Sequence, residues 1–137
     1  VRIVAATNVD MKQAIADREF RQDLYYRLAA VSIAIPPLRE RGNDIDMLFR
    51  KFALEMSERY QMPPIRLNDA ARSALLSYSW PGNIRQLKNV AETMSVTEDV
   101  REITPEILAH YINFQSEHTQ ITVTGTQHSN SRIPTPD

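Results

Sequence analysis

Two short apolar runs in the first part of the chain are typical of buried strands in a parallel sheet. They cover residues 1–6 and 31–35, and a near-continuous run of Val, Ile and Ala marks a strand that is buried on both faces. Such a strand needs neighbours, and two strands do not make a stable sheet alone. The pattern therefore predicts further strands upstream of residue 1, and a chain that is a fragment of a larger protein.

Two short helices are predicted between these strands. Asp10 is suited to cap a helix that ends near Asp17, because its side chain can accept hydrogen bonds from the first helical turn. Residues 20–28 predict a second helix, because their apolar side chains recur at helical spacing. The prolines at positions 36 and 37 then end the second strand.

From residue 43 onward the apolar positions follow the period of a helix. The predicted helices cover residues 44–60, 68–78, 83–95 and 104–112. The expected fold class is thus an α/β fragment over residues 1–41 followed by an all-α subdomain over residues 42–112. Residues 113–137 are rich in Ser, Thr, Gln and Pro, which is typical of a linker or disordered tail.

The composition narrows the classes of site. There is no Cys, so disulfides, zinc–thiolate sites and thiol catalysis are excluded, and the three His are too widely spaced to predict a metal site. The net charge of −1 gives no overall attraction to nucleic acid or to anionic membranes. No apolar run reaches the roughly 20 residues that span a bilayer, and no signal peptide is visible. These features favour a cytoplasmic protein.

Asn8 is the first candidate for function. It follows the first predicted strand, and ligands of α/β sheets collect at the carboxyl ends of the strands. Its amide could hold a water molecule or a phosphate oxygen there. The simpler alternative is a local turn into the next helix.

Arg21 and Arg27 lie on one predicted helix. Their side chains differ by about 120° around its axis, because a helix has about 3.6 residues per turn. They therefore point in different directions and are expected to have different roles. For Arg27, the alternative is a local ion pair with Asp23.

The segment Pro-Pro-Leu-Arg-Glu-Arg at residues 36–41 joins the two predicted parts, and its alternating charges predict a salt-bridged elbow. Further along, the turn at residues 80–83 leads directly into a helix that carries Arg85 in its first turn. The helix dipole disfavours a cation at that end. Arg85 is therefore expected to reach outward to an anion, unless a nearby carboxylate pairs with it.

Four stretches in this order and spacing carry a family resemblance. They are Ala-Thr-Asn at 6–8, Phe-Arg-Gln-Asp-Leu-Tyr-Tyr-Arg-Leu at 20–28, Pro-Pro-Leu-Arg-Glu-Arg at 36–41 followed by Asp-Ile at 44–45, and Trp-Pro-Gly-Asn-Ile-Arg-Gln-Leu at 80–87. Together they resemble the AAA+ domain of sigma-54-dependent transcriptional activators, the bacterial enhancer-binding proteins. The resemblance covers residues 1–112 and implies the last strands of an AAA+ parallel sheet, followed by a four-helix lid subdomain.

The resemblance also implies roles for the candidate residues. Asn8 matches the sensor I residue, which aligns the attacking water and reports the γ-phosphate. Arg21 and Arg27 match the arginine-finger pair, which reaches the nucleotide of a neighbouring subunit in a ring, expected to be a hexamer. Arg85 matches the sensor II arginine of the lid, and Ile84 is expected to pack near the adenine.

Other family elements are absent from residues 1–137. There is no Gly-x-x-x-x-Gly-Lys-Ser/Thr loop, no acidic Walker B strand and no Gly-Ala-Phe-Thr-Gly-Ala loop, which contacts sigma-54 in this family. ATP and Mg²⁺ are therefore expected to bind only in the full-length protein, and the chain alone is expected to be inactive. Sigma-54 RNA polymerase holoenzyme and enhancer DNA are expected to be bound by regions outside this chain.

Two other functions are compatible with parts of the sequence. The helices over 68–78 and 83–95, joined by a turn that contains Gly, superficially resemble a helix-turn-helix that reads DNA. Local charge argues against this, because residues 83–112 hold three basic and five acidic side chains, so 3 − 5 = −2. A helical module that binds another protein would explain residues 43–112 but not the apolar strand at residue 1.

Overall fold

The computed structural model describes residues 1–124, with the surroundings of side chains up to residue 117. The chain divides into two compact units, Val1–Ile35 and Pro36–Asp137.

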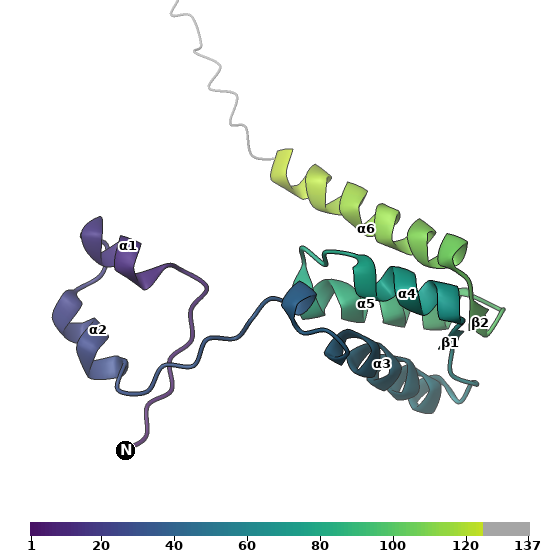
Figure 1. Ribbon diagram of the computed structural model, residues 1–137, viewed down its shortest axis with the longest axis horizontal. Coiled ribbons are helices and arrows are strands. Elements are labelled where there is room, and N and C mark those ends of the chain that lie inside the picture. Colours follow the sequence, from purple (N-terminus) through teal and green to yellow (C-terminus); the bar gives the residue numbers. More distant parts are fainter. Residues whose placement is uncertain (125–137) are drawn as a thin grey trace, which may run out of the picture. The chain divides into compact units, whose positions relative to one another are not determined.

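The first unit contains two short helices, α1 (Met11–Ala16) and α2 (Gln22–Leu28), drawn in purple and dark blue in Figure 1. Asp10 caps α1 as predicted, because its carboxylate accepts hydrogen bonds from the backbone N–H groups of Lys12 and Gln13. The helix predicted over residues 20–28 is present as α2 but begins only at Gln22, so Arg21 precedes the helix that carries Arg27. Ala14 is the buried apolar residue of this unit.

The strands predicted over residues 1–6 and 31–35 do not form in this structure. Both segments lack strand pairing, and their large apolar side chains are exposed, with 84% of Val4 and 84% of Ile33 accessible to solvent. The physical reason is that a strand of a parallel sheet is defined by its neighbours, and the described residues provide none for either segment.

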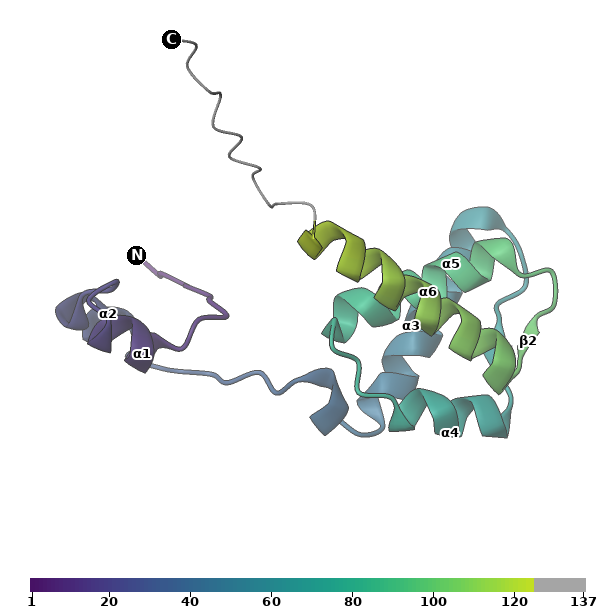
Figure 2. The same ribbon diagram turned by 90° about the horizontal axis from the view of Figure 1, so that it is seen from above.

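The second unit is built from helices. Its elements are η1 (Leu38–Glu40), α3 (Asp44–Tyr60), β1 (Arg66–Leu67), α4 (Asp69–Ser77), α5 (Asn83–Thr97), β2 (Glu102–Ile103) and α6 (Pro105–Thr124). α4 and α5 lie between α3 and α6 in Figure 1, and α6 crosses over α3 and α5 in the view from above in Figure 2. α3, α4 and α5 occupy the places that the helical period predicted, and Asn68 caps α4 by accepting from the N–H of Ala71 at 2.7 Å.

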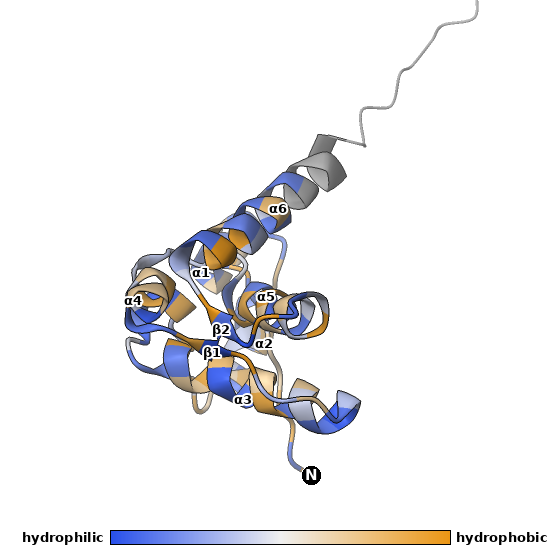
Figure 3. Cartoon of the chain, turned by 90° about the vertical axis from the view of Figure 1, so that its right-hand side faces the viewer, coloured by the Kyte–Doolittle hydropathy of each residue, from blue (hydrophilic) through white to orange (hydrophobic). Residues whose placement is uncertain are grey.

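One hydrophobic core holds this unit together. Figure 3 shows hydrophobic and hydrophilic residues alternating along its helices, as expected of amphipathic helices that pack on one face. Trp80, Phe49 and Leu87 are almost fully buried. Burying a side chain of the size of Leu or Phe stabilises the fold by about 1.5–3 kcal/mol, so this core contributes strongly to the stability of the unit.

A two-stranded parallel sheet closes one end of the unit, and the sequence did not predict it. β1 and β2 pair Arg66 with Glu102 and Leu67 with Ile103. Arg101 holds the segment before β2 in place by donating hydrogen bonds to backbone carbonyls, including that of Ser95 at 3.2 Å in the last turn of α5. Strands of two residues are too short to produce a hydrophobic period.

α6 is longer than predicted. It begins at Pro105, after Thr104 as expected, but it continues to Thr124 instead of ending near Ile112. The residues after Pro105 include no Pro or Gly up to position 124, so nothing in the backbone chemistry interrupts the helix. The part of the predicted tail beyond Thr124 lies outside the described residues. None of the helices in residues 1–124 combines the length and apolarity that crossing a membrane requires.

Tyr111 fastens α6 to the end of α5. Its ring is 7% exposed, and its hydroxyl donates a hydrogen bond of 2.6 Å to the carboxylate of Glu98, the residue that ends α5. Burial, together with the hydrogen bond and the negative charge of Glu98, raises the pKa of Tyr111 to about 12. The folded state therefore keeps the phenol protonated at a pH at which the unfolded chain releases the proton.

We predict that Tyr111→Phe destabilises the chain at pH 7 but much less near pH 11. At pH 7 the variant loses a hydrogen bond to a charged group, worth about 1–2 kcal/mol. As the pH rises above the ordinary tyrosine pKa of 10.0, the unfolded wild type ionises first, so the contribution of Tyr111 to stability is lost toward pH 12. Urea unfolding followed by circular dichroism measures both differences, and an equal difference at the two pH values would contradict the coupling.

Candidate functional site

Asn8 lies in an exposed bend between the first segment and α1. The local hydrogen bond of this bend belongs to Thr7, whose hydroxyl accepts from the N–H of Val9 at 3.1 Å. Within the described residues the side chain of Asn8 makes no hydrogen bond. The simpler alternative, in which the Asn8 side chain forms a hydrogen bond within a local turn, is therefore not observed here.

Arg21 is paired within its own unit. It precedes α2, and its guanidinium meets the carboxylate of Asp23 through Nε to Oδ1 at 3.0 Å and through a terminal nitrogen to Oδ2 at 2.9 Å. The two side chains are 81% and 61% exposed. An ion pair so open to water contributes little stability. Arg21 can therefore exchange Asp23 for another anion at small cost.

Arg27 lies in the last turn of α2 and is exposed. The pair with Asp23 that the sequence left open does not form, because Asp23 binds Arg21 and the N–H of Leu24 instead. Among the described residues, no carboxylate or hydrogen-bond acceptor engages the Arg27 side chain. Its guanidinium is available to an anion from outside this unit.

Ile84 and Arg85 lie in the first turn of α5, in the second unit. That turn contains no acidic residue, and Arg85 is exposed without an ion pair to any described carboxylate. Ile84 is 38% exposed beside it. An exposed apolar side chain and a free guanidinium at a helix N-terminus suit a ligand that has a flat apolar part and an anionic part, since the first N–H groups of a helix also attract anions.

The turn before α5 is held in an unusual conformation. Trp80 and Asn83 have positive φ angles of 47° and 51°, a region that costs a non-glycine residue about 1–2 kcal/mol. The indole of Trp80 offsets this cost, because it is fully buried and donates to the carbonyl of Leu75 at 2.8 Å. Its ring also meets Tyr78 edge to face at 5.0 Å.

Asn83 connects this turn to the elbow. Its side-chain oxygen accepts a hydrogen bond of 2.9 Å from the N–H of Leu38, which is itself buried in the core. The predicted salt bridge of the elbow is present between Arg41 and Asp44 at 3.3 Å. Sequence reasoning missed this role of Asn83, because an asparagine at the start of a helix indicates a local cap and the hydrogen bond joins residues 45 positions apart.

The candidate residues thus fall in both units. Ile84 and Arg85 are adjacent on α5, whereas Asn8, Arg21 and Arg27 belong to the first unit. Among the side chains described, up to residue 117, no group of three His, Asp or Glu is arranged to hold a metal ion. The first unit can supply two guanidinium groups and one amide to an anionic ligand, and the second unit can supply one guanidinium group.

Comparison with known proteins decides the family. The model of the AAA+ ATPase lid domain matches residues 39–124, and that of the sigma-54 interaction domain matches residues 1–34. The chain belongs to the AAA+ ATPases of the sigma-54-dependent activators. The match of the lid begins within the elbow, at residue 39, and runs to the end of α6, so it covers most of the second unit, which is called the lid below.

Relatives of this chain are regulators of transcription. It is 49% identical over 96 residues to the C4-dicarboxylate transport transcriptional regulatory protein DctD of Pseudomonas aeruginosa, covering 70% of this chain and 21% of DctD. It is 49% identical over 90 residues to the sigma54-dependent transcriptional activator SfnR of Pseudomonas putida, covering 66% of this chain and 25% of SfnR. The chain therefore spans about a fifth to a quarter of these relatives.

A solved structure shares the fold of this activator chain. The crystal structure of NtrX from Brucella abortus in complex with ATP has a TM-score of 0.69 and 30% sequence identity, covering 80% of this chain and 26% of NtrX. A second structure of NtrX, in complex with ADP, matches with the same TM-score.

We predict that Asn83→Ala loosens the elbow of this AAA+ lid. The variant leaves the N–H of Leu38 without its acceptor and places alanine at a positive φ, which together cost about 2 kcal/mol. Asn83→Asp keeps the acceptor and tolerates the same φ, so it should lose little. Hydrogen exchange of the Leu38 amide and urea unfolding measure the effect.

Asn89→Ala serves as the control, because Asn89 is exposed on the same helix. If the Leu38 amide exchanges equally slowly in Asn83→Ala and in the wild type, the hydrogen bond from the elbow is not what protects it.

Proposed function

We propose that this chain is the nucleotide-sensing and arginine-finger part of an ATP-hydrolysing ring. In the full-length protein, this ring remodels sigma-54 RNA polymerase holoenzyme. The observation that carries this proposal is that Arg27 and Arg85 stand at the positions of two family motifs and are both exposed without a carboxylate from the described residues. The crystallisation of NtrX with ATP supports nucleotide as the anion.

In the proposed mechanism, the arginines act on the triphosphate. The transition state of γ-phosphoryl transfer spreads negative charge over its oxygens, and a guanidinium already aimed at them stabilises it more than the ground state. Arg27 and Arg21 act as fingers on the nucleotide of the neighbouring subunit. Asn8 orients the attacking water as sensor I.

The lid acts on the nucleotide of its own subunit. Arg85 holds the phosphates as sensor II, next to the N–H groups of the first turn of α5, and Ile84 packs against the adenine. Closing the lid over the nucleotide brings this cation to the phosphates. Opening it after hydrolysis withdraws the same cation, which links the chemical state of the nucleotide to the position of the lid.

The phosphate-binding loop must come from outside residues 1–137, because no Gly-x-x-x-x-Gly-Lys-Ser/Thr sequence occurs among them. Mg²⁺, which accompanies ATP, would be held by that same region and by the phosphates. A finger that acts on a neighbour requires an assembly of subunits, for which we propose a ring of six. Contacts with sigma-54 polymerase and enhancer DNA, in the cytoplasm, belong to other regions of the protein.

The alternative of a DNA-reading helix is not favoured by the structure. α5 is the second helix of the apparent helix-turn-helix, and it buries Leu87, Val90 and Met94 in the core. A recognition helix needs a wide exposed face with basic residues. The face of α5 that remains carries Arg85 and the ion pair of Lys88 with Glu92 at 3.8 Å, so it offers one unpaired basic side chain and not a basic face.

We predict that Arg27→Ala abolishes turnover in an ATPase domain that contains residues 1–124 together with the phosphate-binding loop. The rate should fall by about 10³-fold or more, as for other arginine fingers, while nucleotide affinity stays nearly unchanged. Turnover is measured by phosphate release, and affinity by fluorescent-nucleotide titration. Arg59→Ala, an exposed arginine at the end of α3, is the control.

A mixing experiment tests whether Arg27 acts on a neighbour. Subunits with Arg27→Ala retain their phosphate-binding loop, and subunits with a disabled loop retain Arg27. Rings that contain both types should recover part of the activity that neither has alone. Failure to recover would refute action between subunits, and turnover in Arg27→Ala rings would refute the finger itself.

We predict that Arg85→Ala weakens both nucleotide binding and turnover. The loss of a charged hydrogen bond to phosphate should lower the affinity at least about tenfold, in contrast to the unchanged affinity of Arg27→Ala. Arg85→Lys keeps the positive charge but lacks the planar guanidinium, so it should retain only part of the nucleotide affinity. A silent Arg85→Ala variant would remove α5 from the nucleotide site.

A further inference from the structure

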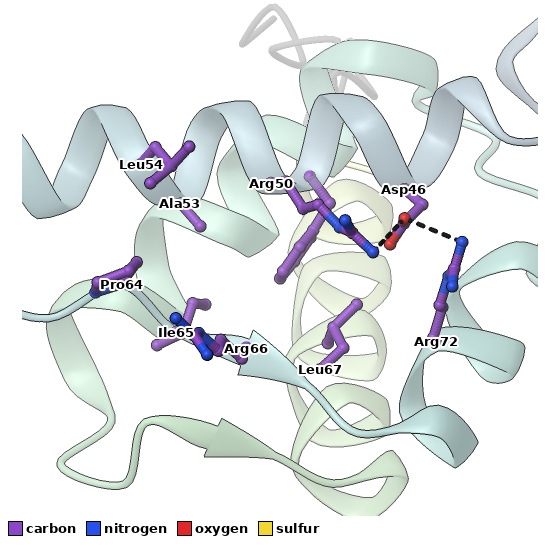
Figure 4. A pocket seen from close by; sticks show the side chains of 10 residues that line it. Asp46, Arg50, Ala53, Leu54, Pro64, Ile65, Arg66, Leu67 and Arg72 are labelled. Carbon is purple, nitrogen blue, oxygen red and sulfur yellow. Dashed lines mark ion pairs between the residues drawn. The ribbon is translucent and has the colours of Figure 1, made fainter.

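The lid contains a groove that has no part in the proposed nucleotide sensing. It lies between α3, β1 and the start of α4, has a volume of about 420 Å³, and is drawn in Figure 4. The volume is within the range of about 300–1,000 Å³ that is typical of ligand sites. Its lining combines cationic side chains with apolar ones, which suits a ligand that is itself both anionic and apolar.

A buried carboxylate organises the cationic wall. The side chain of Asp46 is 7% exposed and binds two guanidinium groups, that of Arg50 at 2.9 Å and that of Arg72 at 3.2 Å. Figure 4 shows both arginines converging on it from different helices. Because Asp46 fixes their positions, Arg50 and Arg72 lose little conformational entropy when they bind a further anion. Their side chains remain 64% and 44% exposed, so their outer N–H groups are accessible.

A third arginine adds charge that is not neutralised. Arg66 is exposed on β1, its backbone is fixed by donating to the carbonyl of Arg101 at 2.7 Å, and its guanidinium has no ion pair among the described residues. The groove therefore carries three arginines and one aspartate, 3 − 1 = +2. The lid as a whole has the opposite sign, since residues 36–124 contain ten Lys and Arg and twelve Asp and Glu, 10 − 12 = −2. The positive charge is thus local to the groove.

The remaining wall is apolar and partly open to water. Leu54 is 53% exposed although it stands on α3 next to the buried Ala53, and Pro64 is half-buried in the segment before β1. An exposed leucine beside a cluster of arginines is a place where an apolar side chain and a carboxylate from one short segment can bind together.

We propose that this groove binds an acidic segment of a protein partner, with a carboxylate on Arg66 and the outer faces of Arg50 and Arg72, and an apolar side chain against Leu54 and Pro64. Duplex DNA fits less well, because its phosphate backbone has no use for the apolar wall and the lid is negative overall. A small free anion would likewise leave Leu54 uncovered. The proposal does not depend on nucleotide binding.

The test uses the 137-residue chain and two labelled peptides. One is Gly-Glu-Asp-Leu-Glu-Gly, and the other replaces each acid by its amide. Fluorescence anisotropy should show binding of the acidic peptide with a dissociation constant of about 1 mM or lower, and the amide peptide should bind at least about tenfold more weakly. Nuclear magnetic resonance should place the perturbed resonances at Arg66, Arg50 and Leu54.

Matched variants separate a specific site from general charge. Arg66→Gln should weaken the acidic peptide about tenfold, and its exposed, unpaired guanidinium makes a loss of fold unexpected. Arg59→Gln makes the same change of charge on the same unit but outside the groove, and it should leave binding unchanged. Leu54→Ser should weaken the acidic peptide and leave the weak binding of acetate unchanged.

Several outcomes would overturn the proposal. The acidic peptide could fail to bind, or Arg59→Gln and Arg66→Gln could weaken its binding equally. Acetate or inorganic phosphate could also bind as tightly as the peptide and perturb the same resonances. Tighter binding of duplex DNA that is lost in Arg66→Gln would identify a nucleic-acid site instead. Self-association in sedimentation that disappears in Arg66→Gln would identify a second copy of the chain as the occupant.

Discussion

The burial of Trp80 is the constraint on which the lid depends. A side chain of this size at the turn between α4 and α5 can be fully covered only if both helices leave the turn in fixed directions, and its indole N–H finds its acceptor in the last part of α4. The positive φ angles of Trp80 and Asn83 are retained because this packing outweighs their cost. The turn that core packing fixes therefore also sets the orientation of Arg85 on α5.

The same turn ties the elbow to the helix that carries the proposed nucleotide sensor. Leu38 is anchored twice, by its side chain in the core and by its N–H on Asn83. A displacement of the start of α5 would therefore have to move the elbow or break a partly buried hydrogen bond. In an ATPase in which Arg85 follows the phosphates, this rigid connection would pass the movement to the segment at which the lid begins.

How much the sequence predicted depends on the range of the interactions involved. Helices such as α1 and α4 follow from local chemistry, because their caps, Asp10 and Asn68, lie next to the residues they cap. The candidate site residues came from motifs and remain a prediction. The pairing of Arg66 with Glu102 and the hydrogen bond from Leu38 to Asn83 join distant residues, so no periodicity reveals them. The apolar segments 1–6 and 31–35 predict strands only if neighbours exist, and the described residues contain none.

The arginines differ in the carboxylates that pair with them. Arg21 has its own carboxylate within two residues, whereas Arg50 and Arg72 share Asp46 between two helices. Arg27 and Arg85 have neither arrangement within the described residues. An arginine without a carboxylate partner stays hydrated by solvent. Its interaction with an anion becomes strongly favourable only where a second surface excludes that water. If Arg27 and Arg85 act as proposed, such a surface is supplied by another part of the protein or by another subunit, and there the two arginines can stabilise phosphoryl transfer.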